Sequence, residues 1–310
     1  MNLIRREAIA MMAVAASTMI GVGVASADWR DEVRPFRIGI LGGQLVEMQL
    51  REHSCLRSRA EQALGVPVEL APSRDYTGIY EGLHDGSIDA AGIGAAGYAG
   101  LFLADPDLVE PLVAPKQEDG LLGYHSVLFV RADSPYRSLE DLRDRSLAFT
   151  ERLSASGFLI PFHELTEQGF TPHQFFGRLA FTGGHTQAVM AVLEGAYDAG
   201  VTWSTMAGDP ERGFSRGNLR RMVDRGLLDM SDVRILWKSE LIAADPHVVR
   251  KAVPEEAKDL YRQLLLDLAE RDGSCFRNIV GDGAVDFEVI TREHYDSIVE
   301  IRRNGIPGDS

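Results

Sequence analysis

The stretch from Phe149 to Pro161, FTERLSASGFLIP, decides how the rest of the chain is interpreted. The mostly apolar run Ser146–Thr150 predicts a buried strand, and Ser154 and Ser156 stand where a helix should begin. The free N–H groups of a first helical turn point outward at the positive end of the helix dipole, so this turn predicts an anion site. Because no G-x-S-x-G elbow surrounds the serines, we expect an oxyanion cradle and not a catalytic serine.

Residues 1–27 are typical of a secretory signal peptide. Arg5 and Arg6 form a basic start, an apolar run extends from Ala8 to about Val24, and positions 25–27 form an A-x-A cleavage signal. An N-terminal membrane anchor is the alternative, but the run is short for a span and ends at the cleavage signal. The arginine pair leaves the choice between the general and the twin-arginine export route open. We therefore expect a mature chain outside the cytoplasm that begins near residue 28.

Composition restricts the partners. The formal charge is −14, and removal of the signal peptide makes the chain one unit more negative. This acidity argues against nucleic acid as a partner. It does not exclude a small anionic ligand, because local dipoles and hydrogen bonds can dominate the electrostatics of a buried site. Cys55 and Cys275 either pair in an oxidising compartment or remain separate buried thiols. No Cys/His spacing resembles a zinc site, and we expect neither a metal nor a cofactor.

Strands alternate with helical patterns along the chain, which predicts parallel βαβ units and an α/β fold. A helical pattern covers residues 46–64 as one segment, and two amphipathic helices are expected at 255–270 and 295–303. Strands are expected at Phe36–Leu41, Val68–Leu70, Ile88–Ile93, Tyr124–Arg131, Ser146–Thr150, Arg178–Thr182, Ala199–Trp203 and Val233–Lys238.

An internal echo predicts two similar lobes. The segment 79–93 reads IYEGLHDGSIDAAGI and the segment 189–202 reads VMAVLEGAYDAGVT, with Gly86 before Asp89 and Gly195 before Asp198 at the same spacing. We expect a first lobe over 28–130, a second over 131–238 and a return to the first over 239–310. Two crossing segments, near 128–133 and 238–245, would then enclose a cleft.

Several short motifs, in order and spacing, resemble the periplasmic solute-binding proteins of phosphonate, phosphate and phosphite ABC importers. The resemblance covers nearly all of the chain after the signal peptide, and it implies a two-lobed type II periplasmic-binding-protein fold. Each lobe would be a mostly parallel sheet flanked by helices, joined by two crossover hinge strands. The motifs are Leu64–Val68 (LGVPV), Arg74–Ile79 (RDYTGI), Gly123–Val127 (GYHSV), Asp133–Pro135 (DSP), Ser154–Pro161 (SASGFLIP), Gly184-His185, Trp237–Ser239 (WKS) and Asp245-Pro246.

The resemblance also implies ligand-binding residues. The family's Ser-Thr-Ser at a helix start grips the phosphonate oxygens, and it matches Ser154, Ala155 and Ser156 here. The middle hydroxyl is missing, but the backbone N–H of Ala155 can still donate. The family's phosphonate-binding histidine matches His185. The alternative role for His185 is to cap a helix at the surface without contacting a ligand.

The facing lobe is implied to contribute two tyrosines, which match Tyr76 and Tyr124. In aminoalkylphosphonate binders, acidic residues hold the ligand's ammonium group, and one of these matches Asp245. The other falls near Thr205, where no carboxylate stands, which weakens the case for an aminophosphonate. Further candidates for the cleft lining are Trp203, and Tyr98, for which core packing is the stronger expectation.

The sequence therefore predicts a monomeric periplasmic binding protein that captures phosphonate, phosphite or phosphate by hinge closure and passes it to an ABC permease. A first alternative is an oxyanion sensor with the same site that partners a membrane histidine kinase. A second is a hydrolase in which Ser154 or Ser156, His185 and Asp245 form a triad. The hydrolase lacks a nucleophile elbow and needs three segments to converge, so we do not expect an enzyme.

Overall fold

The computed structural model describes residues 28–33, 35–41, 46–281 and 283–305. The predicted signal peptide, residues 1–27, lies outside the described residues. None of the helices in the part of the chain that the structure describes combines the length and the apolar character needed to cross a membrane.

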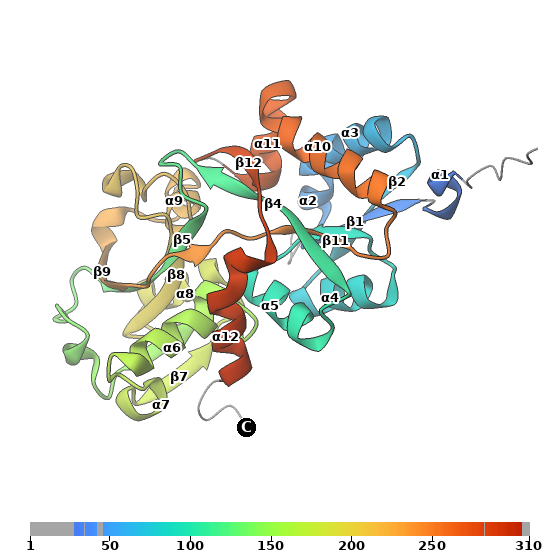
Figure 1. Cartoon of the computed structure of the whole chain (residues 1–310). Coiled ribbons are helices and arrows are strands. Elements are labelled where there is room, and N and C mark those ends of the chain that lie inside the picture. The colour runs from blue at the N-terminus through green and yellow to red at the C-terminus, as the bar shows by residue number, and fades with distance from the viewer. Residues whose placement is uncertain (1–27, 34, 42–45, 282, 306–310) are drawn as a thin grey trace, which may run out of the picture.

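Two six-stranded sheets form the cores of two α/β lobes, which lie beside each other in Figure 1. The first sheet has the order β12 (Ala284–Val289), β4 (Val109–Gln117), β11 (His247–Arg250), β3 (Ala90–Gly92), β1 (Phe36–Leu41) and β2 (Val68–Ser73). The second has the order β10 (Ile242–Ala243), β5 (Gly123–Arg131), β8 (Ala199–Ser204), β6 (Ser146–Phe149) and β7 (Arg178–Phe181), with β9 (Val233–Lys238) also paired to β5. The two-lobed α/β fold is confirmed.

Three strands in each sheet are parallel and follow the same order. β1 lies between β2 and β3, and β6 lies between β7 and β8. In each lobe the next strand along the sheet is antiparallel: β11 pairs with β3, and β5 pairs with β8. Two strands of the first sheet, β11 and β12, come after the second lobe in sequence. The first sheet is therefore complete only when the chain has returned from the second lobe.

The two echoed segments have equivalent roles. The Asp89 carboxylate accepts a hydrogen bond from the backbone N–H of Arg37 at the start of β1, at 2.8 Å. The Asp198 carboxylate accepts one from the backbone N–H of Ser146 at the start of β6, also at 2.8 Å. Asp89, just before β3, thus holds the start of the neighbouring strand β1, and Asp198, just before β8, holds the start of β6 in the same way. This shared role explains why the motif recurs in both lobes.

The helices cover the two sheets. The helical pattern over 46–64 is divided at His53 into α2 and α3, a difference from the single segment expected. The first lobe carries α1 (Trp29–Glu32), α2 (Val46–Glu52), α3 (Ser54–Leu64), α4 (Tyr76–Asp85), α5 (Ala95–Ala104), α10 (Glu255–Arg271), α11 (Gly273–Val280) and α12 (Asp296–Asn304). The second carries α6 (Ile160–Glu167), α7 (Pro172–Phe175), α8 (His185–Leu193) and α9 (Asn218–Asp224), and a π-helical turn, Ala155–Leu159, leads into α6.

The chain passes between the sheets earlier than the boundary expected at residue 130. β5 was assigned to the first lobe, but it pairs with β8 and β9 in the second sheet. The first crossing therefore lies between β4 and β5, over residues 118–122. The return lies after β10, which pairs with β5, over residues 244–246. The apolar pattern of β5 marks a buried strand but does not reveal its partners, because these are distant in sequence.

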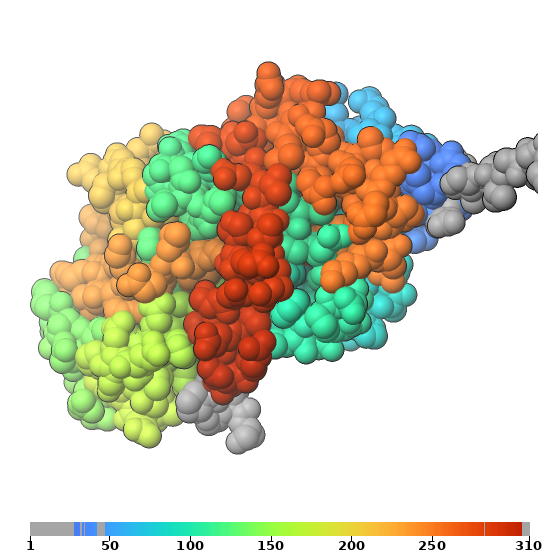
Figure 2. All heavy atoms as spheres, in the orientation of Figure 1, coloured from blue at the N-terminus to red at the C-terminus, as the bar shows by residue number. Residues whose placement is uncertain are grey.

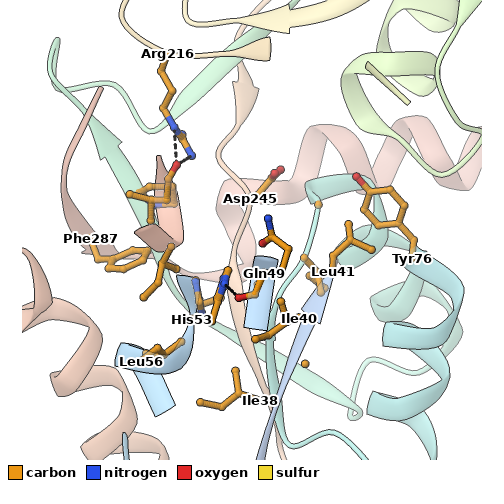
Figure 3. Close-up of a pocket in the computed structure, with 18 of the residues that line it drawn as sticks. Ile38, Ile40, Leu41, Gln49, His53, Leu56, Tyr76, Arg216, Asp245 and Phe287 are labelled. Atoms are coloured by element: carbon orange, nitrogen blue, oxygen red, sulfur yellow. Dashed lines mark hydrogen bonds between the residues drawn. The ribbon is translucent and has the colours of Figure 1, made fainter. Parts of the chain in front are cut away.

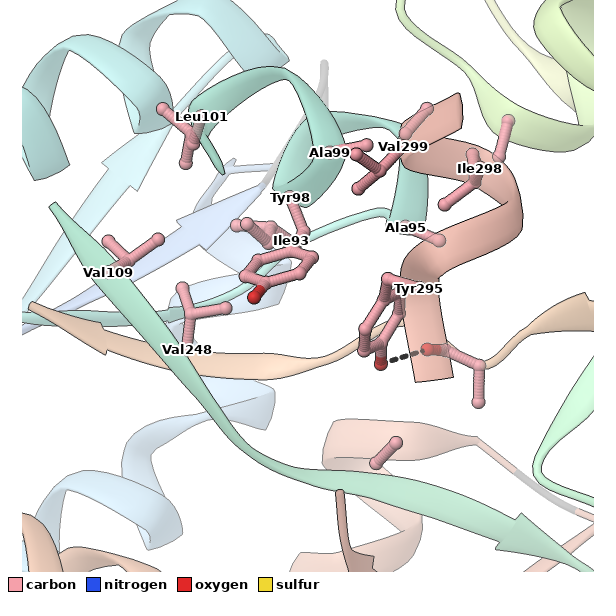
Figure 4. Packing of buried hydrophobic residues seen from close by; sticks show 14 of the residues in the cluster. Ile93, Ala95, Tyr98, Ala99, Leu101, Val109, Val248, Tyr295, Ile298 and Val299 are labelled. Atoms are coloured by element: carbon pink, nitrogen blue, oxygen red, sulfur yellow. Dashed lines mark hydrogen bonds between the residues drawn. The ribbon is translucent and has the colours of Figure 1, made fainter. Parts of the chain in front are cut away.

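Helix α12 packs across both lobes, against α5 of the first and α6 of the second. It crosses the face of the molecule seen in Figure 2. Beneath it, Tyr98 and Tyr295 meet edge to face with ring centroids 4.8 Å apart, and the Tyr295 hydroxyl donates to the Ala244 carbonyl at 2.8 Å (Figure 4). Tyr98 is 1% exposed, so it is a core residue and not part of the cleft lining.

A disulfide joins Cys55 on α3 to Cys275 on α11, with 5.7 Å between their Cα atoms. This settles the alternative that the sequence left open. The two cysteines are 220 residues apart, so the bond closes a loop that contains the whole second lobe. It also fastens α11, whose last turn borders the space between the lobes.

We predict that replacing both cysteines with alanine lowers the free energy of unfolding by about 2–4 kcal/mol, because a crosslink restricts the unfolded chain. Chemical denaturation of the oxidised protein and of the double variant measures the difference. Reductant should destabilise the wild-type protein and leave the variant unchanged. Equal stability of the two oxidised proteins would contradict a structural role for the bond.

Candidate ligand-binding cleft

Two adjoining cavities lie between the lobes, with volumes of about 270 Å³ and about 450 Å³. Residues from both lobes line them, and the walls that they share include Gln49 of α2, Arg216 and Arg221 of the second lobe, and Asp245 of the return crossing. Figure 3 shows Asp245 between Arg216 and Gln49, with Tyr76 across the cavity. The two cavities together form a cleft between the lobes.

Asp245 forms the floor of the cleft at the crossing. Its Oδ1 accepts hydrogen bonds from the Tyr124 hydroxyl at 2.9 Å and from the Ala95 backbone N–H at 3.3 Å. Loss of surrounding water raises the pKa of the Asp245 carboxyl, against the opposing effects of Tyr124 and Arg216. A Cβ at Gly94 would lie 3.7 Å from the Tyr76 ring and 4.0 Å from Asp245, which are ordinary contact distances, so a small side chain would fit beside both residues.

The two predicted tyrosines lie on opposite sides of this floor. Tyr76 opens α4, whose N-cap Asp75 accepts from the backbone N–H of Gly78, and it lines the smaller cavity. Tyr124 begins β5 and lines the larger cavity. Burial and the negative charge of Asp245 raise the pKa of both phenols, so each stays a neutral hydroxyl. Tyr76 can therefore donate to an anion, whereas the single O–H of Tyr124 is already donated to Asp245.

The predicted cradle is a helix start, as the sequence indicates. Ser154 has an extended backbone, and its Oγ accepts from the Gly157 N–H at 3.0 Å, which makes it the N-cap. Ala155 and Ser156 follow as the first residues of the π-helical turn, where N–H groups have no acceptor within the helix. A Cβ at Gly157 would lie 1.7 Å from Thr150 Oγ1, so only glycine fits this close turn.

His185 begins α8 beside this cradle. Its Nε2 lies 3.4 Å from Ser154 Oγ and its Nδ1 lies 3.4 Å from Thr202 Oγ1. Burial and the positive charge of Arg221 lower the pKa of His185 to about 3. The ring is therefore neutral near pH 7 and has one N–H to donate. The structure thus brings together two predicted residues from separate βα turns.

The remaining candidates have different places. Trp203 lines the larger cavity and meets Tyr124 edge to face, with ring centroids 5.2 Å apart. Thr205 is 4% exposed and lines neither cavity; its Oγ1 bonds the backbone N–H and carbonyl of Arg216, each at 3.2 Å. Thr205 therefore holds in place the segment that carries Arg216.

Sequence reasoning missed two arginines of the cleft. The guanidinium carbons of Arg216 and Arg221 lie 5.4 Å and 5.2 Å from the centroid of the Trp203 ring. Arg216 also donates from Nε and Nη2 to the Val280 carbonyl of the first lobe, at 3.1 Å and 2.7 Å, which joins the lobes (Figure 3). The signal was the density of arginines over residues 212–225 in a strongly acidic chain.

The predicted residues Ser154, Ala155, Ser156 and His185 do not line either cavity. The features together define a class of protein: a two-lobed solute-binding protein whose interlobe cleft is lined by tyrosine, amide and cationic side chains. Among the described residues, no group of His, Cys, Asp and Glu side chains could hold a metal ion. The set suits a small anion bound by hydrogen bonds.

The chain belongs to the family of periplasmic substrate-binding proteins of phosphonate ABC transporters, whose family model matches residues 49–295. It is 27% identical to the phosphate-import protein PhnD of Mycolicibacterium smegmatis over 227 residues, 69% of this chain and 67% of that protein. It is 25% identical to the phosphonates-binding periplasmic protein of Escherichia coli over 257 residues, 81% of this chain and 71% of that protein.

A solved structure shows the same fold. The structure of PhnD1 from Prochlorococcus marinus in complex with methylphosphonate superposes on this chain with a TM-score of 0.70 and 18% sequence identity. The superposition covers 87% of this chain and 97% of the PhnD1 chain. The family resemblance inferred from the motifs is thus confirmed, and so is the type of fold.

We predict that the free energy of unfolding falls as the pH decreases below about 6.5, the value of an unfolded histidine. Burial holds the pKa of His185 near 3 and that of His247 near 4, so on acidification the unfolded chain binds protons that the folded chain does not. The loss is at most about 1.4 kcal/mol per pH unit for each histidine. Denaturant titrations between pH 7.5 and about 4.5 measure it.

His185→Gln should make this pH dependence shallower. His84→Gln, which removes an exposed histidine on α4, is the matched control and should not. An unchanged slope in His185→Gln would show that His185 is not held neutral in the folded protein.

Proposed function

We propose that this chain captures a small phosphonate-like oxyanion, such as phosphonate, phosphite or phosphate, and delivers it to an ABC permease as a monomeric periplasmic binding protein. The observation that carries this proposal is the cradle at Ser154–Ser156 with His185 beside it. Hydroxyl, N–H and imidazole donors converge there at a helix start that carries partial positive charge.

Binding would follow from the arrangement of donors on two lobes. The second lobe supplies the cradle, His185 and Tyr124, because β5 belongs to the second sheet, and Tyr76 comes from the first lobe. The expectation that both tyrosines come from the facing lobe is therefore wrong for Tyr124. An oxyanion held by one lobe would draw the other lobe's donors onto its free oxygens, so the ligand stabilises the closed state. Ser156 is 3% exposed, and its hydroxyl has no hydrogen-bond partner among the described residues, which leaves it available to a ligand.

We propose no chemical reaction at this site. A hydrolytic triad needs a carboxylate on Nδ1 of the histidine. Nδ1 of His185 instead lies 3.4 Å from the Thr202 hydroxyl, and Asp245 accepts from Tyr124. The Ser154–His185 pair therefore lacks the group that would orient it for proton transfer, which supports a binding role.

We predict that Ser154→Ala combined with Ser156→Ala weakens methylphosphonate binding by about tenfold or more, on the order of 1.4 kcal/mol, because charge-assisted hydrogen bonds are lost. Isothermal titration measures the affinity. Ser231→Ala, which removes an exposed hydroxyl from the same lobe, is the control. The loss of the Ser154 cap should cost about 1 kcal/mol of stability, so circular dichroism must show that the variant is folded. Unchanged affinity in the folded variant would rule out the cradle.

We also predict that an amine on the ligand adds little. Thr205 stands where an ammonium-binding carboxylate would be needed, and its hydroxyl is bonded to Arg216. Methylphosphonate should therefore bind at least as tightly as 2-aminoethylphosphonate in a thermal-shift or calorimetric comparison. A preference of about tenfold or more for the amine would contradict this view of Thr205.

A further inference from the structure

The larger cavity concentrates positive charge in an acidic protein. Its lining carries more cationic than anionic side chains, although the formal charge of the chain is −14. The cationic residues are Arg216, Arg220, Arg221, Arg225 and Arg277, and the anionic ones are Glu52, Asp224 and Asp245. A cleft lined by one sign of charge concentrates ligands of the opposite sign.

Arg221, like Arg225 and Arg277, has no polar side-chain partner among the described residues, but of these three it alone lines both cavities. Arg216 bonds the Val280 carbonyl, and Arg220 pairs with Asp224 at 2.8 Å. The guanidinium of Arg221 stacks against Trp203, lines both cavities, and makes no hydrogen bond or ion pair within the described part of the chain. Arg221 is an exposed residue at the cleft, so its N–H donors are accessible to solvent or to a ligand.

Asp245 does not neutralise this charge. Its Oδ1 is occupied by Tyr124 and Ala95, and no ion pair within 4 Å joins it to either cleft arginine. Two arginines also outnumber one carboxylate. The cleft thus holds a cationic position separate from the neutral donors at Ser154–Ser156.

We propose that Arg221 binds a second acidic group of the ligand, so that the preferred ligands are organophosphonates that also carry a carboxylate. The phosphonate oxygens lie in the Ser154–Ser156 cradle, and the carboxylate lies against the guanidinium that Trp203 orients. A planar guanidinium matches a carboxylate through two parallel hydrogen bonds. This inference rests on the proposed function, and it is consistent with Thr205 standing at one of the two positions where an ammonium group would require an acidic residue.

The test compares methylphosphonate with phosphonoacetate, which adds one carboxylate, by isothermal titration on the purified protein. The wild-type protein should bind phosphonoacetate about tenfold more tightly or better. Arg221→Gln should remove most of this difference and change methylphosphonate affinity by less than about threefold. Arg221→Lys keeps the charge without the planar fork, so it should retain part of the difference.

Arg212→Gln is the matched control, since Arg212 is exposed on the same lobe and lines neither cavity, and it should change neither affinity. Phosphonoacetate that binds no better than methylphosphonate would overturn the inference and leave the proposed function standing. An equal loss for both ligands in Arg221→Gln and Arg221→Lys would do the same, because Arg221 would then serve the phosphonate itself. If the wild-type protein binds neither compound, the proposed function fails and the inference fails with it.

Discussion

The hydrogen bond from the Tyr124 hydroxyl to Asp245, at 2.9 Å, is the interaction on which the cleft depends. Tyr124 begins the strand that enters the second lobe, and Asp245 lies in the segment that leaves it. The same carboxylate oxygen accepts from the N–H of Ala95, at the start of α5 in the first lobe. One carboxylate therefore joins the ends of both crossings to the first lobe.

The cleft combines two kinds of donor that respond differently to solvent. His185, Tyr76 and Tyr124 are kept neutral because burial disfavours their charged forms. Arg216 and Arg221 remain cationic, although burial lowers the pKa of Arg216 to about 10. Neutral donors hold an oxyanion through direction and geometry, whereas the arginines supply charge. An acidic protein can thus attract an anion to one place while the rest of its surface repels it.

Much of the candidate site could be predicted because its residues lie at strand-to-helix turns, which short stretches of sequence reveal. Ser154 and Ser156 stand between an apolar strand and a helix, and His185 follows a glycine turn of the same kind. Arg216 and Arg221 belong to a loop and a short helix with no such signature. A tyrosine beside a glycine-rich loop, such as Tyr98, can line a cleft or fill a core. Core packing was the stronger expectation for Tyr98, and its contact with Tyr295 agrees with that expectation.

The sequence by itself determined the βαβ alternation, the helix start at Ser154 and the duplicated Asp89 and Asp198 motifs, because each depends on residues close together in the chain. Only the tertiary structure decided that β5 belongs to the second sheet, that Cys55 pairs with Cys275, and that two arginines gather at Trp203 in the cleft. These features join segments far apart in sequence. Hydrophobic periodicity reports which side of an element is buried, but the element that covers it is selected by the packing of the whole fold.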